Sequence, residues 1–127
     1  LGHLSMTSDI WTRIRQYNMR MLSKLVTALE GTPEGNGTMK DNTLIVYTSN
    51  NADKQHTDGA SWPFMTLGNF GGTIQEGRYV KIENGRPINS FYATLLEAAG
   101  RPVEHFNMGG PYEKYDTGKG PLSELLA

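Results

Sequence analysis

The sequence predicts an α/β fold, in which short strands are accompanied by helices, and three segments carry the prediction. Apolar residues recur at helical spacing over about residues 9–30 and again over about residues 89–99. Residues 43–48 instead form a nearly unbroken run of strand-forming residues. A helix, then strands, then a second helix is a typical element order for an α/β domain. The long amphipathic helix at the start is the clearest of these patterns.

The first helix, about residues 9–30, is predicted from an apolar stripe and from residues that suit its two ends. Ser8 is a good N-cap, Gly31 suits the left-handed position after the last turn, and Pro33 blocks continuation. The stripe comprises Ile10, Trp11, Ile14, Met21, Leu22, Leu25, Val26 and Leu29. The other face carries Arg13, Arg15, Arg20 and Lys24, which we interpret as a solvated surface.

The apolar run at 43–48 follows a Gly-, Pro- and Asn-rich loop and is predicted to form a strand buried on both faces. Strands of this kind belong to sheets covered by helices on both sides, where ligands bind beyond the carboxyl ends of the strands. The predicted site is therefore the polar cluster just past Thr48. It comprises Asn50, Asn51, Asp53, Lys54 and His56.

The remaining elements are shorter. Residues 63–68 predict a second strand, with Trp62-Pro63 anchoring the polar loop before it, and residues 78–82 are a candidate third strand. The glycines at 68, 71 and 72 indicate a turn with positive φ rather than a phosphate-binding loop.

The second helix, about residues 89–99, has Asn89 or Ser90 as its predicted N-cap and is closed by Gly100. The last residues, 121–127, predict a short docking helix.

Composition limits the function classes. The 127 residues are enough for one domain with a core, and the net charge of −1 gives no electrostatic reason to expect nucleic acid or an anionic membrane as partner. No segment is long and apolar enough to span a bilayer, and the absence of cysteine excludes disulfides and thiolate metal sites. The opening LGHLSMTSD resembles neither a start nor a signal peptide, so we expect the carboxyl-terminal part of a longer polypeptide.

The segment from Leu25 to Asn50, LVTALEGTPEGNGTMKDNTLIVYTSN, resembles the alkaline-phosphatase and sulfatase superfamily, where such a strand delivers metal ligands. The resemblance is closer to an uncharacterised bacterial family, domain-of-unknown-function family 1552, which is related to that superfamily. Its carboxyl-terminal region is similar to this chain in PFMTLGNFGG, GRYVKI, INSFYATLLEAAG and the terminal GPLSELL. The resemblance covers about residues 20–127.

The resemblance implies that residues 1–127 form the carboxyl-terminal part of one alkaline-phosphatase-like, doubly wound sandwich. It also implies an exported or periplasmic protein. In active members, an Asp-His pair after this strand binds a metal, a later His helps to complete the site, and the nucleophile comes from the amino-terminal half. Here Asn50 and Asn51 stand at the Asp and His positions, and His56 is the candidate for the later His.

Two functions remain open. Neutral amides are poor zinc ligands and only auxiliary calcium ligands, so a divalent metal at His56 would need ligands from the upstream part of the same polypeptide. With them, the parent protein would be a metal-dependent sulfate- or phosphate-ester hydrolase. Otherwise Asn50 and Asn51 bond their own backbone, His56 lies in a solvated loop, and the protein is a non-catalytic descendant of the fold. We favour the second interpretation. His3 is a weaker candidate site residue, and His105 is predicted to lie at the surface.

Overall fold

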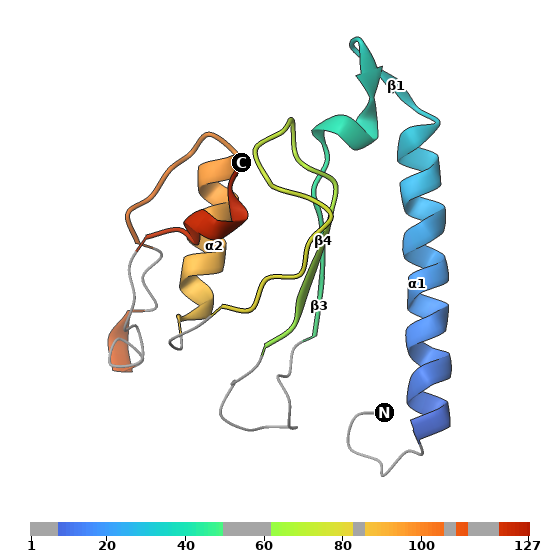
Figure 1. Cartoon of the computed structure of the whole chain (residues 1–127), viewed down its shortest axis with the longest axis horizontal. Helices are drawn as coiled ribbons and strands as arrows, with labels where there is room; N and C mark the ends of the chain where they lie inside the picture. Colours follow the sequence, from blue (N-terminus) through green and yellow to red (C-terminus); the bar gives the residue numbers. More distant parts are fainter. Residues whose placement is uncertain (1–7, 50–61, 83–85, 106–108, 112–119) are drawn as a thin grey trace. The chain divides into compact units, whose positions relative to one another are not determined.

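The computed structural model describes residues 8–49, 62–82, 86–105, 109–111 and 120–127 (Figure 1). The chain divides into two compact units, Leu1–Thr66 and Leu67–Ala127. Both helices and short strands are present, so the predicted α/β class is confirmed. The elements near each end of the chain lie close to their predicted bounds, whereas the sheet differs from the prediction.

The first unit begins with helix α1, Ser8–Glu30, which matches the predicted helix. The prediction for its carboxyl end was wrong, because Gly31 does not adopt positive φ. Instead the Thr32 hydroxyl donates to the Ala28 carbonyl at 2.8 Å, and the Thr32 amide donates to the Leu29 carbonyl at 3.2 Å. These bonds satisfy carbonyls that the last helical turn leaves open, so a left-handed residue is not needed.

The segment predicted as a plain loop contains a small hairpin and a helical turn. Strands β1 (Pro33–Glu34) and β2 (Gly37–Thr38) pair antiparallel, with Pro33 opposite Thr38 and Glu34 opposite Gly37. A 3₁₀ helix, η1 (Met39–Asn42), follows at once. The Thr43 hydroxyl then donates to the Met39 carbonyl at 2.6 Å, so Thr43 belongs to the end of η1 rather than to the strand.

Strands β3 (Ile45–Thr48) and β4 (Phe64–Leu67) form a second two-stranded sheet. The Thr48 hydroxyl donates to the Pro63 carbonyl at 2.8 Å, so β4 begins where β3 ends and the pair runs antiparallel (Figure 1). Residues along β3 alternate between half-buried and exposed. The prediction that residues 43–48 are buried on both faces was therefore wrong. Among the described residues, no further strand joins this sheet, and the alkaline-phosphatase-like sandwich stays a prediction.

The second unit is organised around helix α2, Ile88–Ala98. Its side chains supply most of a small core, which comprises Ile74, Phe91, Ala93, Ala98 and Leu122. Gly100 has φ of +69°, its amide bonds the Glu97 carbonyl, and the Arg101 amide bonds the Leu96 carbonyl. These two bonds form a Schellman motif, so the predicted stop at Gly100 is confirmed.

The carboxyl-terminal segment returns to this core. The short 3₁₀ helix η3 (Ser123–Leu125) confirms the predicted docking helix, and Leu126 forms an isolated antiparallel bridge with Ile74. Residues 78–82 form no strand, so that prediction was wrong. The Arg78 side chain donates instead to the Glu124 carbonyl. The glycine turn is confirmed, because Gly68, Gly71 and Gly72 all have positive φ.

Candidate functional site at the end of strand β3

The carboxyl end of β3, where the sequence predicts a site, is closed by a tryptophan. Trp62 lies just before β4, and its indole Nε1 donates to the Ser49 carbonyl at 2.8 Å and to Thr48 Oγ1 at 3.1 Å. Thr48 Oγ1 in turn donates to the Pro63 carbonyl. Trp62 therefore anchors the loop, as predicted, but to the strand end rather than within a buried core.

This closure joins Ser49 to Trp62, the described residues that flank residues 50–61 in the sequence. The predicted site residues, Asn50, Asn51 and His56, lie outside the described residues, and His3 does as well. Their roles stay predictions. What the described residues establish is the base of the site, a polar strand end whose hydroxyl, indole and carbonyl groups already bond one another.

A second polar contact joins α1 to β3. The Asn18 side-chain amide donates to Tyr47 Oη at 3.1 Å, and the contact is partly buried. Asn18 lies four residues from both Ile14 and Leu22, in the middle of the apolar stripe. Sequence reasoning missed this contact, although an amide within an apolar stripe is the signal that could have revealed it.

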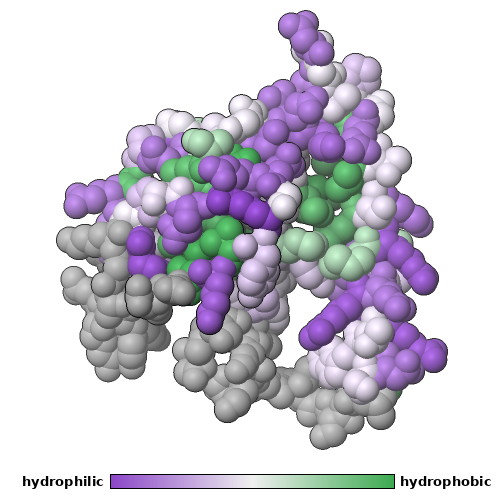
Figure 2. Space-filling view, in the orientation of Figure 1, coloured by the Kyte–Doolittle hydropathy of each residue, from purple (hydrophilic) through white to green (hydrophobic). Residues whose placement is uncertain are grey.

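The apolar stripe of α1 is wider than the surface that covers it. Its half-buried part comprises Trp11, Ile14, Leu22, Val26 and Leu29, and no described residue of the helix is fully buried. The exposed part comprises Ile10 (41% exposed), Met21 (37%) and Leu25 (45%), and the exposed Tyr17 (61%) lies beside them on the helix. Figure 2 shows hydrophobic surface on the β3 side of α1 and hydrophilic surface on its outer side. We refer to these four exposed residues as the uncovered strip.

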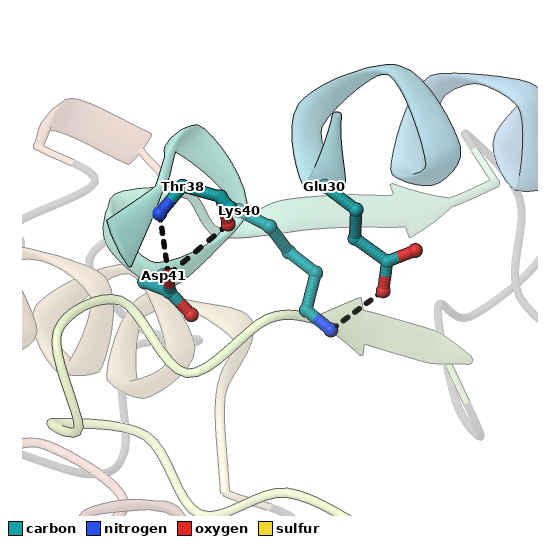
Figure 3. A network of polar contacts seen from close by, with 4 residues as sticks. All are labelled: Glu30, Thr38, Lys40 and Asp41. Atoms are coloured by element: carbon teal, nitrogen blue, oxygen red, sulfur yellow. Dashed lines mark hydrogen bonds and ion pairs between the residues drawn. The ribbon is translucent and has the colours of Figure 1, made fainter. Parts of the chain in front are cut away.

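The turn between β2 and η1 carries a polar network of four residues (Figure 3). The Asp41 carboxylate accepts from the Thr38 amide at 2.7 Å and from the Thr38 hydroxyl at 3.0 Å. These two bonds, the amide first, lower the pKa of Asp41 below its ordinary value of 3.8. Lys40 Nζ reaches back to Glu30 Oε1 at 2.8 Å, at the end of α1. The network fixes the turn, and its carboxylates are engaged in structural bonds.

The second unit holds a polar cluster beside its core. Arg86 precedes α2, and its guanidinium donates to Ser90 Oγ and to the Gly120 carbonyl, both at 3.0 Å. Within the helix, the buried Thr94 hydroxyl donates to the Ser90 carbonyl at 2.7 Å and accepts from the Leu122 amide at 2.8 Å. The cluster ties the carboxyl-terminal segment to α2, which is a structural role.

The same cluster corrects the predicted start of the second helix. Its N-cap is Pro87, not Asn89 or Ser90, and both of those side chains are buried in the first turn. A cation at a helix amino terminus is electrostatically unfavourable. The position of Arg86 just before the helix therefore indicated that its guanidinium bonds carbonyl groups elsewhere in the chain. His105, predicted to lie at the surface, is half-buried.

Over the described ranges, no group of three or more His, Cys, Asp or Glu side chains is placed to hold a metal ion. No helix in that part of the chain is both long and apolar enough to cross a bilayer.

No family model, curated protein or solved structure matches the chain. The resemblance to family 1552 and to the phosphatase and sulfatase superfamily therefore stays a prediction from the sequence.

Proposed function

We propose that the chain is a non-catalytic, structural and binding part of a larger α/β domain of alkaline-phosphatase-like fold. The proposal rests on the exposure of α1. This helix of 23 residues has no buried residue, and several of its large apolar side chains are exposed. Helices in proteins owe most of their stability to packing of an amphipathic face. A helix of this length and pattern therefore needs more cover than the described part of the first unit provides.

The sheet supports the same proposal. Strands β3 and β4 contain four residues each and pair only with each other among the described residues. A two-stranded sheet is marginally stable in water unless more strands or a packed helix complete it. In our proposal, the upstream part of the same polypeptide supplies these strands and the cover for α1, as the resemblance implies.

The residue types after β3 favour the non-catalytic version over a hydrolase. Asn50 and Asn51 stand where the resemblance expects Asp and His, and a neutral amide contributes neither charge nor a strong nitrogen donor to a metal. The hydroxyl of Thr48 and the carbonyl of Ser49, at the base of the same loop, already bond Trp62.

Elemental analysis of the complete polypeptide, purified without chelators, tests the chemical part of the proposal. We expect less than one equivalent of zinc, calcium or manganese, and no hydrolysis of 4-nitrophenyl phosphate or sulfate above the buffer rate. His56→Ala should leave metal content and thermal stability unchanged, with His105→Ala as a control for unspecific histidine binding. A stoichiometric metal that His56→Ala removes would restore the hydrolase alternative, with its nucleophile upstream.

Unfolding of the 127-residue chain tests the structural part. Both tryptophans, Trp11 and Trp62, lie in the first unit, so tryptophan fluorescence, excited where tyrosine does not absorb, reports that unit alone. We expect a broad fluorescence transition in urea, because the first unit contains no described buried residue. A sharp two-state transition would contradict the proposal, since it would mean that this unit folds cooperatively without further polypeptide.

A further inference from the structure

The uncovered strip of α1 has a basic edge. Arg13 lies three residues from Ile10 and four from Tyr17, and Lys24 lies three residues from Met21. Residues three or four apart are neighbours on a helix surface, so these cations line one side of the strip, with Arg20 between them. The other side of the strip adjoins the half-buried residues near β3. The helix carries four basic residues against two acidic ones, although the whole chain has a net charge of −1.

Within the described ranges, most of this positive charge has no ion-pair partner. Arg13 forms an exposed pair with Asp9 at 3.0 Å, within the helix. In the part of the chain that the structure describes, Arg20 and Lys24 form no ion pair. These cations border the apolar side chains of the strip on one side. The strip therefore matches a partner whose own apolar side is bordered by carboxylates.

We propose that the uncovered strip and its basic edge bind an acidic amphipathic helix, with the carboxylates of that helix placed against Arg20 and Lys24. The inference deepens the proposed function, on which it rests, by naming the chemistry of the segment that covers α1. The strip from Ile10 to Leu25 extends over about 22 Å at about 1.5 Å per residue, so a partner helix of four turns covers it.

A second copy of the chain fits less well. When two identical helices pack antiparallel about a two-fold axis, the same edge of each helix meets itself, and Arg13 and Lys24 would face like charges. In a parallel pair the basic edge would meet the opposite side of the strip, where Asn18 and Leu22 lie, and these carry no carboxylate. An anionic bilayer is also a poorer match, because headgroups surround a helix on both sides and the cations here line one side.

Fluorescence anisotropy of the 127-residue chain tests the proposal with a labelled amphipathic peptide of about 18 residues, enough for a helix that spans the strip. The peptide has leucines on one face and glutamates along one edge, and a sister peptide has lysines in their place. We expect the acidic peptide to bind more tightly than the basic one. Arg20→Glu with Lys24→Glu should weaken binding of the acidic peptide about tenfold and strengthen binding of the basic peptide.

Two matched controls lie on the same helix. Arg15→Glu makes the same charge change away from the strip and should alter binding less than about twofold. Met21→Asn should weaken binding several-fold, whereas Met19→Asn should not, because the two methionines are almost equally exposed (37% and 38%) and only Met21 is in the strip. Circular dichroism of each variant checks that α1 is still helical.

Several outcomes would overturn the proposal. Equal binding of the acidic and basic peptides, or no saturable binding of the acidic one, would show that the strip does not bind an acidic amphipathic helix. A dimer by light scattering that Met21→Asn dissociates would assign the strip to a second copy. Binding to phosphatidylserine vesicles without binding to the peptide would assign it to a membrane. None of these outcomes changes metal content or hydrolysis, so failure here is distinguishable from failure of the proposed function.

Discussion

The two units of the chain differ in what their helices pack against. In the second unit, an 11-residue helix buries six of its residues, because the carboxyl-terminal segment returns to it and Arg86 and Thr94 bond that segment. In the first unit, a helix about twice as long buries none, and β3 is joined to it by the Asn18–Tyr47 contact. An amphipathic pattern therefore predicts a helix, but not how much of its apolar face the same chain will cover.

Truncating one large apolar side chain in each helix should produce the largest difference. Phe91 is 5% exposed, and Phe91→Ala should cost about 3–5 kcal/mol, enough to abolish protection of the α2 amides in hydrogen exchange. Leu25→Ala, at an exposed position of α1, should change the free energy of unfolding by less than about 0.5 kcal/mol. A large cost at Leu25 would show that the uncovered strip is packed in solution, so that the two helices would not differ in cover.

The polar cluster of the second unit offers a sharper test of its closure. Thr94→Val keeps the shape of the side chain but leaves the buried Leu122 amide without its acceptor, so it should destabilise this unit by about 1–3 kcal/mol. Thr94→Ser retains the hydroxyl and serves as the control. If both substitutions cost the same, then the methyl group contributes as much to the stability of the second unit as the hydroxyl does. Amide exchange at Leu122 measures the difference directly.

The two helix ends give a smaller, matched effect. Gly100→Ala forces an alanine into left-handed backbone, at a cost of about 1 kcal/mol to the second unit. Gly31→Ala places its Cβ at ordinary van der Waals distance from the Thr27 carbonyl, without positive φ, so it should be neutral or stabilising by about 0.5 kcal/mol. Thermal melts of the two variants compare the ends. Equal destabilisation would contradict the different end structures.

The smallest effect concerns pH and is confined to the first unit. Since bonds from Thr38 lower the pKa of folded Asp41, its carboxylate stabilises the β2–η1 turn at pH values above the ordinary pKa of 3.8. That stabilisation is lost as the pH falls below 3.8 through the lower folded-state value. A carbon-detected NMR titration should place the Asp41 midpoint below 3.8, and Thr38→Ala, which removes the hydroxyl bond but keeps the amide bond, should raise it partway. A midpoint at the ordinary value of 3.8 would show that Asp41 does not accept these bonds from Thr38 in solution.

The predictions from sequence succeeded where neighbouring residues decide the outcome. The helix over residues 9–30, the stop at Gly100 and the glycine turn after β4 follow from spacing, from φ preferences and from bonds within a few residues. The carboxyl end of α1 shows the limit of this reasoning, because a threonine hydroxyl satisfied the carbonyl for which a left-handed glycine was expected.

The tertiary structure decided which faces are covered and which polar groups meet. Strand β3 has the composition of a strand buried on both sides, yet it pairs with β4 and alternates between half-buried and exposed residues, since burial depends on what packs against a strand. Trp62 with Ser49, Arg86 with Gly120, and Thr94 with Leu122 are separated by 13 to 34 residues, and no local pattern specifies such pairs. The helices and the polar residue types after β3 follow from the sequence alone. Contacts between distant segments decided that the second unit has a core and that α1 has an uncovered strip.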